Sequence, residues 1–150
     1  MNQLVFGYDQ EVAEWVSRRV PRPFEPKHLG PFTTIGVMND GKPIAGFIYS
    51  RFKGHDIEIT GAASSPKWCR RGIICALLSY PFEQLGCVRV TMITGKKNYR
   101  ARKIIKALGF REEGAHALAY DGKQDACSYG LTRSTWRDGK FAPKTTKELS

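Results

Sequence analysis

The sequence has little that would mark a membrane, exported or metal-binding protein. Among its 150 residues the longest apolar stretch, residues 72–78, is far shorter than the roughly 18 residues a membrane span needs. The start carries no basic segment followed by an apolar one, so we expect a cytoplasmic protein. The four cysteines form no C-x-x-C pair and no zinc spacing with histidine, so we expect free, mostly buried thiols and no metal site.

Acidic residues are also scarce. There are 14 of them against 24 Lys and Arg, which gives a formal net charge of +10. Such a surface attracts polyanions, whether nucleic acid, membrane lipid or a phosphate-rich cofactor, and the sign of the charge does not choose among them. The basic residues gather in two clusters, one at Lys67, Arg70 and Arg71 and the other at Lys96, Lys97, Arg100, Arg102, Lys103, Lys106 and Arg111.

The hydrophobic pattern predicts a single mixed α/β domain with the element order β-α-βββ-α-β-α-ββ. The expected strands are residues 4–8, 32–38, 44–52, 57–63, 88–94, 110–120 and 125–131. The signals for turns and helix ends are local. Asp9 predicts a helix N-cap, Asn39-Asp40-Gly41 a hairpin turn, Pro81 the end or a kink of the helix that starts at Gly72, and Asn98 and Gly109 the two ends of a helix over 99–108.

Two stretches resemble a known family. Residues 66–78 read Pro-Lys-Trp-Cys-Arg-Arg-Gly-Ile-Ile-Cys-Ala-Leu-Leu, and residues 98–114 run from Asn-Tyr-Arg-Ala to Leu-Gly-Phe-Arg-Glu-Glu-Gly. They are similar to the two coenzyme A motifs of the GCN5-related N-acetyltransferases (GNAT), and most like the branch that acetylates N-termini of ribosomal proteins. The resemblance covers about residues 4–136. It implies the GNAT acyl-CoA N-acyltransferase fold over 1–136. The Lys and Thr content of residues 137–150 predicts a basic, flexible tail.

The resemblance also implies acetyl-CoA as co-substrate. A loop that enters a helix presents unpaired amides and the positive end of the helix dipole, which suits a pyrophosphate. The residues it assigns to the cofactor are Arg70, Arg71, Gly72, Ile73, Ile74 and Cys75 in the first motif, and Asn98, Arg100, Arg102 and Lys103 in the second. Two alternatives stay open: Gly72 only starts a helix beside solvated arginines, and Asn98 only caps one.

Acetyl transfer to an amine needs a proton acceptor and an oxyanion donor. Glu58, which points away from the apolar pair Ile57 and Ile59, is the candidate base; the alternative is a solvent-facing strand residue. We expect the oxyanion donor to be a backbone amide near Gly61 or Ala62, freed by a bulge. The position where many relatives carry a tyrosine acid is Ile105, and Tyr129 is the candidate substitute; its alternative role is packing.

Together these features predict an N-acetyltransferase that moves acetyl from acetyl-CoA to a primary amine by direct transfer in a ternary complex. The expected acceptor is a protein N-terminus or a small molecule, with no membrane partner, and the protein is expected to be a monomer or homodimer. The alternative is a non-catalytic module that binds acyl-CoA or, through the basic helix over 99–108, nucleic acid.

Overall fold

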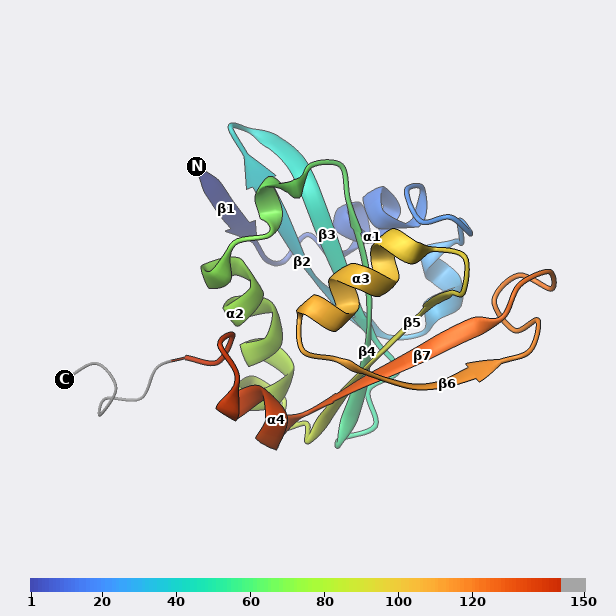
Figure 1. Ribbon diagram of the computed structural model, residues 1–150. Helices are drawn as coiled ribbons and strands as arrows, with labels where there is room; N and C mark the ends of the chain where they lie inside the picture. Colours follow the sequence, from blue (N-terminus) through green and yellow to red (C-terminus); the bar gives the residue numbers. More distant parts are fainter. Residues whose placement is uncertain (144–150) are drawn as a thin grey trace.

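The computed structural model describes residues 1–143 of the chain (Figure 1). One sheet runs in the order β1-β2-β3-β4-β5-β7-β6, and every neighbouring pair is antiparallel except β4 and β5. Its strands are β1 (Asn2–Val5), β2 (Phe32–Asn39), β3 (Lys42–Ser50), β4 (Asp56–Ala63), β5 (Arg89–Gly95), β6 (Arg111–His116) and β7 (Ala126–Thr132). The helices are α1 (Asp9–Ser17), α2 (Arg71–Ser79), α3 (Tyr99–Ala107) and α4 (Arg133–Asp138). The predicted order is confirmed, with α4 as an addition.

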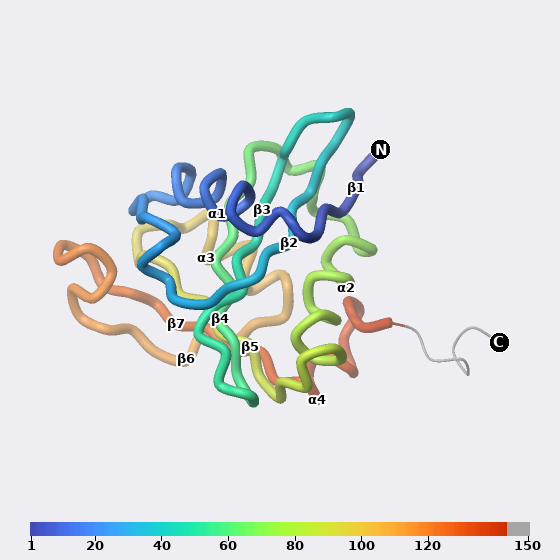
Figure 2. The backbone as a smooth tube through the Cα atoms, turned by 180° about the vertical axis from the view of Figure 1, so that it is seen from behind, coloured from blue at the N-terminus to red at the C-terminus, as the bar shows by residue number. Residues whose placement is uncertain are grey.

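The helices cover the two faces of the sheet unequally. α1 lies alone on one face, where Ala13 and Val16 pack on Ile48 of β3. α2 and α3 lie on the other, where Ile74 and Ile105 join the main core. Figure 2, seen from behind, shows α1 in front of β2 and β3, with β6 and β7 extending beyond it. We call these the α1 face and the α2 face.

The hairpin between β2 and β3 forms where its turn sequence predicts it. Asn39 pairs with Lys42 across a two-residue loop. Asp40 and Gly41 have φ of 51° and 80°, the left-handed conformation that a type I′ turn requires at both positions. Aspartate and glycine adopt this conformation more readily than other residues, so this junction is encoded locally.

Asp9 does not cap α1 as expected, because it lies inside the helix and Tyr8 is the N-cap. The Asp9 carboxylate instead accepts hydrogen bonds from the backbone amide and the hydroxyl of Thr34 on β2, at 2.9 and 2.8 Å. The same acceptor therefore serves tertiary packing and ties α1 to the sheet.

Pro81 ends α2 as predicted, and a π-helical turn (Tyr80–Gln84) follows Ser79. Proline has no N–H, so the carbonyl of Leu77, four residues earlier, loses its helical partner. The buried hydroxyl of Tyr49 on β3 donates to that carbonyl at 2.6 Å. The carbonyl left unpaired at the end of the helix thus finds its hydrogen-bond donor on the sheet. This hydrogen bond holds the C-terminal end of α2 against β3.

The predicted domain boundary at residue 136 falls within α4 and stays a prediction. α4 extends through Arg137 and Asp138, and Ala142 is buried against the main core. The rest of the expected tail, 144–150, lies outside the described residues. Across residues 1–143 no helix has the length and apolarity that a membrane crossing requires.

All four cysteines are free, as expected, but they are not mostly buried. Cys87 and Cys127 are buried, whereas Cys69 is exposed and Cys75 is only half-buried. Both of the accessible thiols lie in the first predicted coenzyme A motif, where the chain passes over the surface into α2.

Candidate functional site

The first predicted motif folds into the N-terminal turn of α2. Arg70 is its N-cap, with the extended backbone that precedes a helix, and contributes no capping side chain. The amide of Ile74 bonds to the Arg70 carbonyl, so the amides of the three residues before Ile74 lack helical partners. A Cβ built on Gly72 would meet no atom within 4 Å, which leaves the backbone of this turn open to a ligand.

The two isoleucines of the motif do not obstruct the turn. Ile73 and Ile74 are both buried in the main core, and Cys75 is half-buried behind them. The Ile74 side chain therefore points into the core, away from the open side of the turn. Only its backbone amide takes part in the helix start.

Arg70 and Arg71 are both exposed at this turn. Arg71 is nevertheless held in place, because its Nη2 donates to the carbonyl of Ala142 at 3.1 Å. Within residues 1–143 neither arginine forms an ion pair. Two permanent positive charges thus flank the free amides.

β4, the strand before this turn, diverges from its neighbour β5. β4 pairs with β5 only from Asp56↔Arg89 to Glu58↔Thr91, although both strands continue for several residues. The amide of Ser64 donates to Ile44 at 2.8 Å, on the β3 side, and backbone groups alternate along a strand. The amides of Gly61 and Ala63 therefore point to the β5 side, beyond the last β4–β5 pair.

The expected bulge at Gly61 or Ala62 is absent. The register between β3 and β4 is continuous from Ala45↔Ala63 to Ser50↔Glu58. Because β4 diverges from β5, every second amide on the β5 edge of β4 is unpaired without an inserted residue. Gly61 therefore remains the candidate oxyanion donor. The amide of Ala62 points toward β3, so Ala62 is no longer a candidate.

Glu58 lies on the α1 face, at the last residue of β4 that pairs with β5. Its side chain is 21% exposed, and its Oε2 lies 3.5 Å from Nε of Arg51. Burial raises the pKa of this carboxyl above its ordinary value. The negative charge of Asp56 acts in the same direction, whereas Arg51 and Lys53 oppose it.

Arg51 and Asp56 were not singled out in the sequence, although both tune Glu58. Arg51 directly follows β3, has a φ of 56°, and lies next to the Ser50↔Glu58 pair. The pairing of the predicted strands 44–52 and 57–63 indicates the contact between Arg51 and Glu58, because it places the residue after Ser50 beside Glu58.

The second predicted motif forms the start of α3. The Asn98 side chain accepts from the amide of Ala101 at 3.2 Å, so Asn98 is an N-cap. Arg100 and Lys103 are exposed, and neither forms an ion pair within the described part of the chain. They remain available for an anion.

Arg102 differs from its neighbours because protein acceptors occupy its guanidinium. It donates to the Tyr129 hydroxyl at 2.9 Å, to the Lys96 carbonyl at 3.0 Å and to Glu112 at 3.0 Å. This arrangement joins α3 to β6 and β7 and gives Arg102 a structural role in place of the expected phosphate contact.

Tyr129, the candidate acid, and Ile105, at the position that the resemblance assigns to an acid, are both inside the core. Tyr129 has 0% of its surface exposed and holds Arg102 through its hydroxyl, and Ile105 is 4% exposed. Neither reaches the surface where β4 and β5 diverge, so we assign Tyr129 to packing and do not carry it into a mechanism.

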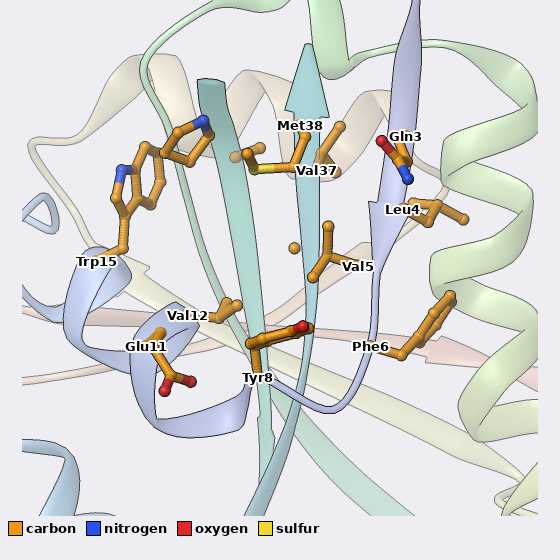
Figure 3. A pocket seen from close by; sticks show the side chains of 13 residues that line it. Gln3, Leu4, Val5, Phe6, Tyr8, Glu11, Val12, Trp15, Val37 and Met38 are labelled. Carbon is orange, nitrogen blue, oxygen red and sulfur yellow. The ribbon is translucent and has the colours of Figure 1, made fainter. Parts of the chain in front are cut away.

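Two cavities occur elsewhere in the described residues. The larger, of about 670 Å³, lies between β1, α1 and the neighbouring strands (Figure 3), and Val5, Val12 and Trp15 are among the residues that line it. The smaller, of about 190 Å³, lies between the end of α3 and the segment after α4. Neither includes the N-terminal turn of α2.

Comparison with solved structures identifies the fold. The ribosomal-protein-S18-alanine N-acetyltransferase from Escherichia coli is 20% identical, with 97% of each chain covered and a TM-score of 0.65. Mutant forms of the spermidine/spermine N-acetyltransferase SpeG from Vibrio cholerae are 16% identical, with 92% of this chain and 98% of that chain covered and a TM-score of 0.71. A probable acetyltransferase is 18% identical, with 90% and 94% covered and a TM-score of 0.66.

No protein-family model and no curated protein sequence matches this chain. At these identities the structural likeness establishes the fold, which is that of GNAT acetyltransferases, and the predicted fold class is confirmed. The neighbours act on different acceptors according to their names, so the narrower resemblance to the ribosomal-protein branch stays a prediction.

Proposed function

We propose that the protein is an N-acetyltransferase that transfers the acetyl group of acetyl-CoA directly to a primary amine. One observation carries the proposal. The end of β4 that has no β5 partner is followed, after the short 3-10 turn Pro66–Trp68, by a helix start with free amides and two exposed arginines, in the fold of known N-acetyltransferases.

The exposed groups fit the chemistry of coenzyme A. Its diphosphate is an anion suited to the α2 amides, with Arg70 and Arg71 as charge-assisted donors. Arg100 and Lys103 supply separate charge for its 3′-phosphate. Its linear arm carries amides, and the amide of Ala63 offers that arm a hydrogen bond of the kind a neighbouring strand would make.

Glu58 is the proposed base. It removes a proton from the acceptor ammonium, and the amine lone pair then attacks the thioester carbonyl carbon. A raised pKa brings the carboxylate closer to the pKa of an amine and makes proton transfer less unfavourable. An amide on β4, with Gly61 as the first candidate, donates to the oxygen as negative charge develops on it.

The reaction needs no acid at position 105. The new C–N bond forms as the C–S bond breaks, and sulfur leaves with the bonding electrons as a thiolate. The attacking nitrogen then loses its extra proton to the thiolate or to solvent, which leaves a neutral amide. A thiol has a pKa of about 8.5, so the thiolate is a competent leaving group near neutral pH. Ile105 is therefore compatible with catalysis.

For the acceptor we propose a protein N-terminus. α1 packs mainly over β2, β3 and β4. Next to Glu58 the same face of the sheet continues onto β5 and β7. There Ile93 is 42% exposed, and Ser128, its partner on β7, lies 3.4 Å from His116. This floor combines an apolar side chain with polar groups, which suits a peptide, and nearer to Glu58 it also carries the ion pairs of Arg89 with Asp56 and Glu113. The net charge of +10 disfavours a free polyamine.

A transfer assay with three acceptors tests the proposal. We expect coenzyme A release with a short peptide that has a free N-terminus, little release with spermidine, and none with the same peptide blocked at its N-terminus. Calorimetry with acetyl-CoA provides an independent reading of cofactor binding. A chain that does not bind acetyl-CoA, but binds nucleic acid with a steep loss on adding salt, would support the alternative module instead.

A further inference from the structure

The segment after α4, residues 139–143, folds back toward the start of α2. Trp136 anchors it: its ring stacks on Phe82 with centroids 4.9 Å apart, and its Nε1 donates to the Phe141 carbonyl at 3.1 Å. Ala142, the next residue, is buried at 8% exposure. Its carbonyl accepts the 3.1 Å hydrogen bond from Nη2 of Arg71.

This contact orders Arg71 without neutralising it. A backbone carbonyl carries no net charge, so the guanidinium keeps its full positive charge, and a single Nη2 hydrogen bond leaves other N–H donors free. An exposed arginine otherwise samples many rotamers, and binding an anion must restrict them. When the protein restricts them beforehand, that part of the cost is removed from ligand binding.

We propose that Ala142 is a positioning residue for the diphosphate site, acting through its main-chain carbonyl to hold Arg71 at the N-terminus of α2. The inference rests on the proposed function, because it assumes that Arg71 meets the diphosphate of acetyl-CoA. It assigns a role in cofactor affinity to a segment that the sequence pattern placed outside the domain.

The test compares a chain that ends at Asp138 with a chain that ends at Pro143, which keeps every contact described above. Each is assayed with acetyl-CoA and with S-acetylpantetheine, which carries the same thioester but no diphosphate. We expect the shorter chain to show a KM for acetyl-CoA about 2- to 10-fold higher, the range for immobilising one side chain, with kcat unchanged. The KM for S-acetylpantetheine should stay the same.

The same truncation in an Arg71→Ala background completes the cycle. If the segment acts through Arg71, removing it there should produce no further rise in KM. Should the shorter chain fold poorly by circular dichroism, Trp136→Phe replaces it, because phenylalanine can still stack on Phe82 but cannot donate to Phe141. We expect the same selective rise in KM, of smaller size.

The other outcomes overturn the proposal separately from the proposed function. An equal KM for the two chains, with Arg71→Ala still weakening acetyl-CoA, would refute positioning alone. Tighter binding by the shorter chain would show that the segment competes with the cofactor, and an equal loss for both thioesters would show a general structural effect. A full-length chain that does not bind acetyl-CoA would refute the proposed function itself.

Discussion

Replacing Arg51 with alanine should move the acid limb of the pH–rate profile to higher pH. The proposed base works only as a carboxylate, so kcat/KM falls as pH drops through the pKa of Glu58. The positive charge of Arg51, 3.5 Å away, stabilises that carboxylate and lowers its pKa. Without Arg51 the pKa rises, and the limb follows it upward.

The size of the shift follows from the exposure of the pair. The Arg51 side chain is 72% exposed, so solvent screens the interaction and the surface ion-pair range of about 0.2–1 kcal/mol applies. At about 1.36 kcal/mol per pKa unit, the limb should move by roughly 0.2–0.7 pH unit. Lys42→Ala is the matched control, because it removes the same charge at the opposite end of β3 and should leave the limb in place.

The assay measures coenzyme A release by chromatography between pH 5 and 9. The acceptor amine titrates over the same range, but it is identical in every variant, so only the displacement between variants reports on Glu58. Glu58→Gln should lose about 10²- to 10⁴-fold in kcat/KM at pH 7. Full activity in Glu58→Gln, or a limb in Arg51→Ala that does not move or moves to lower pH, would refute Glu58 as the base.

Three further outcomes concern stability and cofactor affinity. Glu58→Gln should raise the Tm at pH 7–8 by about 1–3 °C, because a pKa raised on folding means that the charged carboxylate destabilises the fold. The gain should vanish below about pH 4, where the Glu58 carboxyl is neutral, as the glutamine side chain is at every pH. Arg102→Ala should lower the free energy of unfolding in urea, because the hydrogen bonds of Arg102 to other elements are lost. It should raise the KM for acetyl-CoA less than Arg100→Ala does. A larger rise in KM for Arg102→Ala than for Arg100→Ala would support Arg102 as a phosphate ligand. Tyr49→Phe should cost about 1–3 kcal/mol in urea unfolding, since it leaves the Leu77 carbonyl buried and unpaired; a cost near zero would show that water replaces the hydroxyl.

Several features could be predicted because their causes lie within a few residues. The Asp40-Gly41 turn, the Asn98 cap and the end of α2 at Pro81 each depend on backbone preferences or on a side chain that reaches its own backbone. The alternation of apolar residues on β4 likewise placed Glu58 on the face opposite Ile57 and Ile59. From these local rules the element order and the candidate base follow.

Local patterns could not show which partners long side chains would find. Asp9 and Arg102 are a good cap residue and a good phosphate ligand by type, yet the fold brings Thr34 to the first and Tyr129 to the second. Position 142 carries no signal at all, because its contact with Arg71 is made by a backbone carbonyl.

The chain alone specifies a basic helix start, a glycine that leaves its backbone open and a glutamate on a strand. Only the folded sheet decides where β4 and β5 stop pairing, how deeply Glu58 is buried and what holds Arg71. The physical reason is range: caps, turns and alternation act over a few residues, whereas strand divergence, desolvation and side-chain pairing depend on segments that are distant in sequence and meet only in three dimensions.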